Sequence, residues 1–343
     1  MIPMIPRSSP CRFLEPVGGA PGLLASDLMR YLLRRSENPE PGSLPMHHHH
    51  RTPIRARRPL VGLILPLLLL MALPALAGQV TSRAEGAALV ADHPENPASY
   101  MDYGRLLMGQ QDYKAAAEIL EKGRAKARPS ADLLVLLSKV YQRDELFARA
   151  EAATREALLL DPAHIKAHLC MGEIYFRLGW NKSALESLEQ AVALAPDDDL
   201  PKVRLVEALC RDQQLQAAED QCLQFLATNN QSPDLWLSLG QVFEKQERRR
   251  QAFTTYGQVL TIDPDNSMAF ARQGRLFCQF GQFTSAESAC RRALELDPDN
   301  ALGHAYLGIA CAKLGQNSEA REHAEIAEDA GLNMLSVWRI LDN

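Results

Sequence analysis

The sequence predicts an all-α fold, a right-handed superhelical solenoid of helix-turn-helix units. The first observation is a 34-residue pattern that begins at residue 97 and occurs seven times without an insertion. A fixed period of this length is typical of stacked helical repeats. The second is composition: 46% of residues are apolar but only 6% are aromatic. Alanine and leucine supply most of the apolar content, and both favour helices. Few stretches alternate apolar and polar residues, so no sheet is expected.

The chain opens with residues 1–45, which are rich in proline and glycine and show no sustained periodicity. We expect a disordered leader here, or a start site assigned too far upstream. A secretory signal counted from Met1 would be 77 residues long, whereas one counted from Met46 would have an ordinary length. Met46 is therefore the alternative start.

Residues 46–77 have the parts of a signal peptide or an N-terminal membrane anchor. An uncharged apolar run at 60–77 follows four arginines and ends in Ala75-Leu76-Ala77, a small-x-small exit. Eighteen apolar residues can also just span a bilayer uncleaved. Because the positive flank precedes the run, both readings place the repeats outside the cytoplasm, secreted or anchored to the inner membrane and facing the periplasm.

Charge separates this head from the body of the chain. Residues 1–77 hold nine basic and four acidic residues, and the remaining residues have a net charge of −10. Nucleic-acid binding usually requires a basic surface, so we expect no nucleic-acid partner.

The body divides into a lead-in helix at 78–96, seven units at 97–334 and a C-terminal capping helix at 335–343. Asp-Pro pairs close several units, and proline disfavours helix in the residue before it. The units start at Pro97, Ala131, Ile165, Asp199, Pro233, Ser267 and Ala301.

Small residues also recur at fixed places within the units. Gly240 and Gly274 are each followed twelve residues later by alanine, at Ala252 and Ala286. Glycine inside a helix costs about 1 kcal/mol relative to alanine, which indicates a close backbone approach. We expect each glycine to face its alanine across the paired helices.

The unit that begins at Pro233 carries this pattern most completely, with Trp236, Leu239, Gly240, Phe243, Ala252, Tyr256 and Pro264. It resembles the tetratricopeptide repeat, and the resemblance covers about 240 of the 343 residues. With the N-terminal segment, the chain is similar to exported or membrane-anchored members of that family in bacteria. The resemblance implies a concave groove, lined by the first helix of each unit, that binds a protein or peptide segment.

The basic residues expected to line this groove are Arg105, Lys139, Arg143, Lys166, Arg177, Arg211, Lys245 and Arg275. They indicate an acidic or mixed-charge partner segment; the alternative is that they pair with intervening glutamates such as Glu173, Glu207 and Glu244. Some relatives clamp a peptide carboxylate with lysine and asparagine. No unit has asparagine at the required position, where this chain has Asp102, Leu136, Cys170, Arg204, Ser238, Arg272 and Tyr306.

Catalytic and ligand-binding motifs are missing from the sequence, with no glycine-rich phosphate loop, G-x-S-x-G or H-E-x-x-H. We therefore predict no enzyme activity, cofactor, metal or small-molecule substrate. His164 and His168 have helical spacing, but His168 falls where other units have Trp236 or Phe270. A packing role is expected for it.

Six cysteines follow residue 77, and an even number in an exported chain can indicate disulfides. Cys210 and Cys222 share a unit but should lie on the order of 10 Å apart, too far for a bridge. Buried free thiols are the favoured interpretation.

The function expected from the sequence is an exported or membrane-tethered protein-interaction scaffold, one that organises an envelope-associated complex. The alternative is a regulatory or assembly subunit bound to one specific enzyme.

Overall fold

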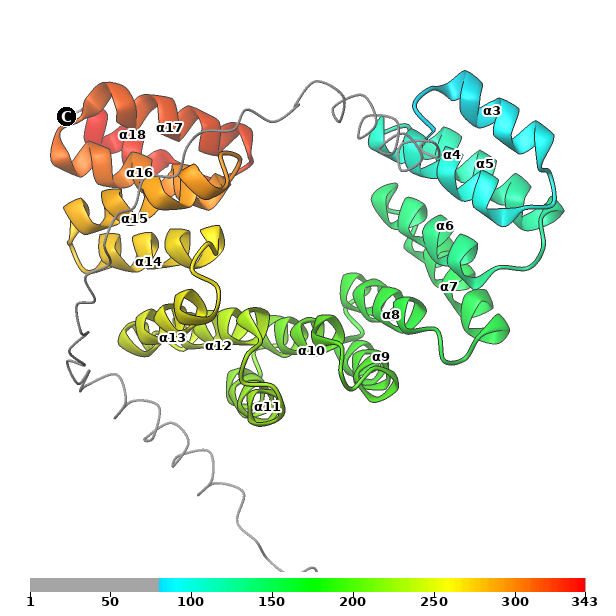
Figure 1. Ribbon diagram of the computed structural model, residues 1–343, viewed down its shortest axis with the longest axis horizontal. Helices are drawn as coiled ribbons and strands as arrows, with labels where there is room; N and C mark the ends of the chain where they lie inside the picture. Colours follow the sequence, from blue (N-terminus) through cyan, green and yellow to red (C-terminus); the bar gives the residue numbers. More distant parts are fainter. Residues whose placement is uncertain (1–79, 343) are drawn as a thin grey trace, which may run out of the picture. The chain divides into compact units, whose positions relative to one another are not determined.

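The structure is a computed structural model, and it describes residues 80–342, all within one compact unit of the chain. These residues form sixteen α-helices and no strand (Figure 1). The predicted all-α solenoid of helix-turn-helix units is confirmed. The expected leader at 1–45 and the signal or anchor segment at 46–77 lie outside the described residues. None of the described helices is long and apolar enough to cross a membrane.

The helices alternate between the first and second helix of successive units. The even-numbered helices from α4 to α16 are first helices, and the odd-numbered ones from α5 to α17 are second helices. The bounds are α3 Arg83–Asp92, α4 Pro97–Gly109, α5 Tyr113–Lys126, α6 Ala131–Arg143, α7 Phe147–Leu160, α8 Ile165–Arg177, α9 Asn181–Leu194, α10 Asp199–Arg211, α11 Leu215–Thr228, α12 Pro233–Lys245, α13 Arg249–Ile262, α14 Ser267–Gln279, α15 Phe283–Leu296, α16 Ala301–Leu314, α17 Asn317–Asp329 and α18 Leu335–Leu341.

Every first helix begins directly after a residue whose side chain caps it. Each capping side chain accepts a hydrogen bond from a backbone N–H in the first turn, which has no partner within the helix. The seven capping residues are Asn96, Ser130, His164, Asp198, Ser232, Asn266 and Asn300. These caps fix where each unit starts, 34 residues after the one before.

A second recurring feature joins the two helices of each unit. The residue at position 15 of all seven units, counted from the first residue of its first helix, has a positive φ. Glycine fills it at Gly179, Gly281 and Gly315, and glutamine or glutamate fills it at Gln111, Glu145, Gln213 and Glu247. The next residue's amide donates to the carbonyl five residues before it, as Trp180 does to Tyr175 at 2.8 Å. This left-handed cap ends the first helix and turns the chain back.

Position 20 of each unit lies in the second helix and is alanine in all seven units. These residues are Ala116, Ala150, Ala184, Ala218, Ala252, Ala286 and Ala320, and none has exposed surface. The nearest side chain to Gly240, however, is not the predicted Ala252. A Cβ on Gly240 would lie 2.3 Å from the ring of Tyr256, sixteen residues later. A Cβ on Gly274 would likewise lie 2.3 Å from the Cys290 sulfur and 3.5 Å from the backbone oxygen of Ala286.

The second unit has Ser138 in place of this glycine, and its hydroxyl is satisfied inside the core. It donates to the backbone oxygen of Ala150 at 2.9 Å and lies 2.6 Å from the hydroxyl of Thr154. Burying a hydroxyl without a partner would destabilise the fold, so Ser138 and Thr154 form a matched pair.

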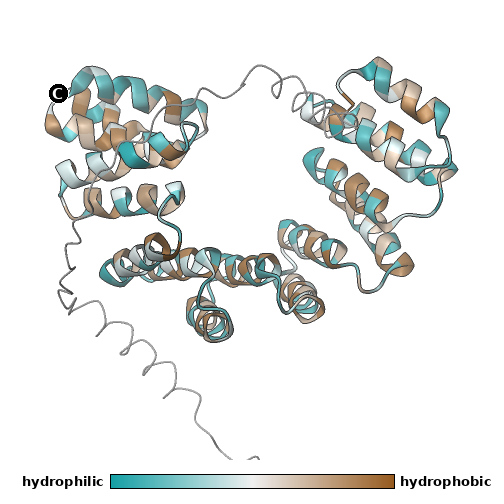
Figure 2. Ribbon diagram, viewed as in Figure 1, coloured by the Kyte–Doolittle hydropathy of each residue, from teal (hydrophilic) through white to brown (hydrophobic). Residues whose placement is uncertain are grey.

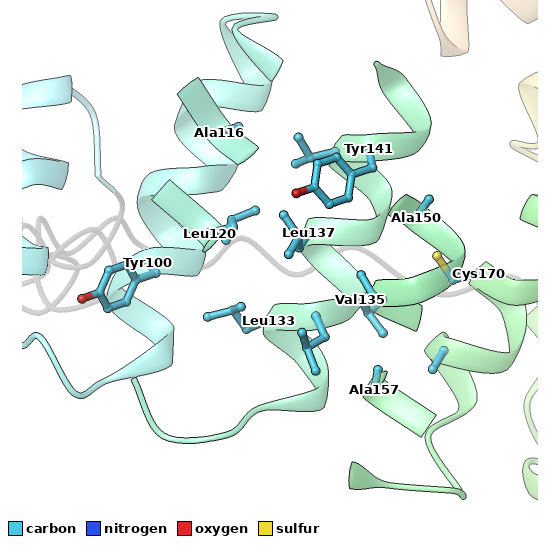
Figure 3. Close-up of a cluster of buried hydrophobic side chains, with 14 of the residues drawn as sticks. Tyr100, Ala116, Leu120, Leu133, Val135, Leu137, Tyr141, Ala150, Ala157 and Cys170 are labelled. Carbon is cyan, nitrogen blue, oxygen red and sulfur yellow. The ribbon is translucent and has the colours of Figure 1, made fainter. Parts of the chain in front are cut away.

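The core continues from one unit to the next. One buried cluster takes side chains from every helix between α4 and α8, including Tyr100, Leu120, Leu137, Ala150 and Cys170 (Figure 3). Apolar and polar residues share the helices along the described chain (Figure 2). At the C-terminal end, α18 packs against α16 and α17 and buries Val337.

Replacing Gly240 with alanine should lower the stability of the fold by about 1–3 kcal/mol, because the added methyl group must displace the buried Tyr256 ring. Gly109→Ala is the matched control. Gly109 ends α4 and has open space around its missing side chain, so this change should leave stability the same or raise it slightly. Thermal unfolding followed by circular dichroism measures both, and equal melting temperatures would contradict the packing described.

Candidate functional site

All eight basic residues predicted to line the groove lie on first helices. Seven are exposed, and Arg275 is partly buried. Three of them form ion pairs that join the first helices of neighbouring units. Arg211 lies 2.9 Å from Glu173 and Arg275 lies 2.9 Å from Glu244, while Lys166 lies 3.9 Å from Asp132. These ion pairs bring Lys166, Arg211 and Arg275 against the first helix of the preceding unit. We call the side of the first helices that carries the eight basic residues the first-helix face.

The other five differ in whether a partner is present. Arg105 pairs with Asp102 at 2.7 Å and Arg177 pairs with Glu173 at 3.5 Å, each within its own helix. Such exposed pairs contribute little to stability. Lys139, Arg143 and Lys245 have no ion-pair partner among residues 80–342 and leave positive charge on α6 and α12; they are exposed. The predicted pairing with glutamates is thus seen for some of the eight and not for these three.

One cluster on this face combines charge with burial. Both Arg275 and Arg272 of α14 approach the same oxygen of Glu244, with their Nη1 atoms at 2.9 and 3.6 Å. The other carboxylate oxygen accepts a hydrogen bond of 2.7 Å from the Tyr256 hydroxyl. Burial raises the pKa of the Tyr256 phenol, which keeps the proton on this donor. The Arg275 guanidinium lies over the ring of Tyr306, 5.9 Å from its centroid.

Arg272 and Tyr306 were not predicted as members of this cluster. The sequence showed them only at the position where some relatives have an asparagine that clamps a peptide carboxylate. The available signal was the pair Arg272 and Arg275, which are three residues apart and so share one side of a helix.

A ring or hydroxyl group near the start of four first helices contacts a carbonyl oxygen six residues earlier. His168 and His304 each place Nε2 2.9 Å from such an oxygen, Trp236 donates its indole N–H at 2.9 Å, and Tyr100 donates its hydroxyl at 3.0 Å. The contact ties the first helix to the preceding turn. It gives His168 a structural partner, Pro162.

The run Arg248-Arg249-Arg250 lies at the turn into α13. Arg248 is held by Glu219 at 2.6 Å and stacks on Phe243, with its guanidinium 4.4 Å from the ring centroid. Arg249 and Arg250 are exposed at the start of the second helix.

The six cysteines of the described chain are free thiols, and all except Cys278 are buried. Burial raises the pKa of Cys278 to about 12 and that of Cys311 to about 11, since the thiolate loses its hydration there. It also raises the pKa of Cys210, Cys222 and Cys290. No group of three or more metal-binding side chains occurs within residues 80–342.

Comparison with known proteins identifies the repeat. Family models described as tetratricopeptide repeat match residues 82–132, 165–198, 233–266 and 271–331, which together are just over half of the chain. The human protein O-mannosyl-transferase TMTC1 is 24% identical over 200 residues, or 57% of this chain and 22% of its own. The chain spans about a quarter of the length of the curated relatives that it matches.

Solved structures show the same fold at low sequence identity. A tetratricopeptide repeat protein from Parabacteroides merdae superposes with a TM-score of 0.54 at 16% identity, covering 72% of this chain and 97% of that one. Yeast Tom70 superposes with a TM-score of 0.62 at 14% identity, covering 76% of this chain and 57% of its own.

The buried thiols should resist modification. With Cys11 replaced by serine, the folded protein at about pH 8 should react slowly or not at all with an aromatic disulfide reagent. Five of the six thiols are buried and out of reach of the reagent. The raised pKa of Cys278, the one that is not fully buried, leaves almost no thiolate, the reactive form, at that pH. Denaturant should release six reactive thiols without prior reduction. Rapid labelling of the folded protein, or fewer than six thiols after denaturation, would contradict this account.

Proposed function

Because the chain belongs to the tetratricopeptide-repeat family, we propose that it is a protein-interaction scaffold whose first-helix face binds an acidic or mixed-charge segment of a partner protein. The observation that carries this proposal is the unpaired positive charge of Lys139, Arg143 and Lys245. These cations lie on first helices of a body whose net charge is −10. Basic side chains concentrated on one face of an acidic body favour a partner of opposite charge.

Charge of this kind acts mainly on encounter and register. Opposite charges raise the rate at which a partner finds the surface and penalise misplaced partners, more than they raise affinity. A repeat solenoid offers a long surface for an extended or helical segment. The scaffold therefore needs affinity from apolar contacts as well, and exposed side chains such as Met268 on α14 and Leu200 on α10 are available for them.

The proposal extends to the place of action. The apolar run at 60–77 behind four arginines supports export, with the repeats outside the cytoplasm either released or held at the inner membrane. There the scaffold would organise an envelope-associated complex. The alternative is permanent association with one enzyme, as a regulatory or assembly subunit. Purification from the native host separates these functions, because only the alternative gives a single enzyme in fixed stoichiometry.

Charge reversal tests the binding face. In Lys139→Glu/Arg143→Glu, two cations without ion-pair partners on α6 become anions. Capture of the native partner should fall about tenfold or more, and what remains should depend less on salt. The control is Lys122→Glu/Lys126→Glu, which reverses two exposed lysines with the same spacing on the second helix α5.

Pull-down from host extract at low and moderate salt, quantified by mass spectrometry, reports both variants. Equal losses in the two variants would mean that net charge matters and that the face does not. Loss in the α5 control alone would move the binding site to the second helices.

The N-terminal segment makes a separate prediction. In the native host the mature chain should begin near Gly78, or the intact chain should stay in the membrane fraction through residues 60–77. Cell fractionation and N-terminal sequencing distinguish the two forms. Recovery of the intact chain from the cytosol would refute the proposed location and leave the scaffold proposal standing.

A further inference from the structure

We propose that His304 of α16 and His323 of α17 form a pH-sensitive joint, which holds the seventh unit closed at neutral pH and opens it in mild acid. The Nδ1 atoms of the two imidazoles lie 2.9 Å apart, and their ring centroids lie 5.0 Å apart. His304 is 8% exposed, and the side chain of His323 is 14% exposed. The joint lies between the two helices of one unit, so it does not depend on what the first-helix face binds.

The hydrogen bonds of His304 fix where the protons of this pair lie. Nε2 of His304 is 2.9 Å from the carbonyl oxygen of Pro298, which can only accept, so this nitrogen carries a proton. In the neutral ring Nδ1 is then an acceptor, and His323 must donate to it from its own Nδ1. The contact between the two Nδ1 atoms thus holds one proton.

Protonation of both rings is incompatible with this contact. One added proton can be placed on Nε2 of His323, which leaves the shared hydrogen bond in place. A second added proton has only Nδ1 of His304 left, and it would set two N–H donors of two cations against each other at 2.9 Å. Like charges at this distance in a buried contact repel strongly.

Charged groups face His323 from its own helix and from α15. Glu319 has Oε1 3.7 Å from Nε2 of His323, and Glu322 is its neighbour in the chain. Both carboxylates attract a proton to His323, whereas Arg291 of α15 opposes it. Arg291 also pairs with Glu319 at 2.7 Å and holds the pKa of Glu319 below its usual range. Glu319 therefore stays ionised in mild acid, where histidines titrate.

The other two helices that pack on the seventh unit make polar contacts with other residues of it. Arg275 of α14 lies over the ring of Tyr306, 5.9 Å from its centroid. Trp338 of α18 donates its indole N–H to Glu328 at 2.7 Å.

The direction of the pH effect follows from His323. Burial, together with repulsion from His304, lowers the pKa of His323 below its usual range. An open or unfolded unit binds this proton more readily, since an imidazole in water titrates near about pH 6.5. Above that pH the contact contributes fully to stability. As the pH falls below it, the open form takes up protons first and the contribution is lost.

The packing around the joint makes the two helices respond together. A Cβ on Gly308 would lie 3.4 Å from the backbone oxygen of Ala320 and 3.7 Å from the backbone carbon of His323. The backbones of α16 and α17 are therefore close beside the two imidazoles, and charge repulsion there acts directly on the helix pair. No further unit stacks on this one in the described chain, where the seven-residue α18 packs against it.

Hydrogen exchange of the full chain at about pH 7.5 and about pH 5.5, corrected for the intrinsic exchange rate at each pH, tests the joint. Protection in α16 and α17 should fall about tenfold more than in α8 and α9, as expected when the open unit binds one proton about tenfold more tightly. The third unit is the matched comparison. Its His168 also contacts a proline carbonyl at 2.9 Å, but the residue at the place of His323 is Ser187. An equal fall in both units overturns the proposal.

Two variants assign the effect to the histidine pair. His323→Gln keeps an amide donor for His304 but cannot become charged. His323→Ala places alanine where the second and sixth units have Ala153 and Ala289, so the unit should still fold. Both should abolish the extra loss of protection in α16 and α17, and the control His168→Gln should leave it unchanged. Extra loss that persists in both His323 variants, or that disappears equally in His168→Gln, overturns the proposal.

Discussion

The close approach of the two helices in each unit is the contact on which the rest of the structure depends. Position 20 is alanine and fully buried in all seven units, so the second helix can lie directly against the first. Interiors packed at this density respond to a single methyl group, as the space around Gly240 shows. The hairpin is therefore a rigid unit, and stacking it leaves the first helices side by side with one surface in common.

The Tyr256 side chain connects this packing between helices to the charged cluster of Glu244, Arg272 and Arg275. Because Gly240 has no side chain, the Tyr256 ring can cross from α13 to α12, where it is fully buried. Its hydroxyl then meets Glu244, one turn further along α12, and Glu244 in turn draws in Arg272 and Arg275 from the next unit. A small residue in the core thus positions charge on the surface.

The sequence predicted the fold well because its signals are local and repeated. The Asp-Pro pairs and the 34-residue period are visible in the chain itself, and Gly240 with Ala252 pointed to a tight hairpin. The true neighbour of Gly240, Tyr256, could not be predicted, since contact depends on side-chain direction as well as on spacing. The seven turn residues were hidden for another reason: four of them are glutamine or glutamate, which do not signal a positive φ. Pairs such as Arg211 with Glu173 depend on the register between units, which no single unit encodes.

Hydrogen exchange of the full chain with and without its captured partner tests the central claim most directly. The account predicts that amides in the first helices become protected, most strongly in α6, α12 and α14, where unpaired or shared arginine and lysine side chains lie. The second helices should change little. Protection concentrated in the second helices, with the first helices unchanged, would contradict the claim that the first-helix face is the working surface of this protein.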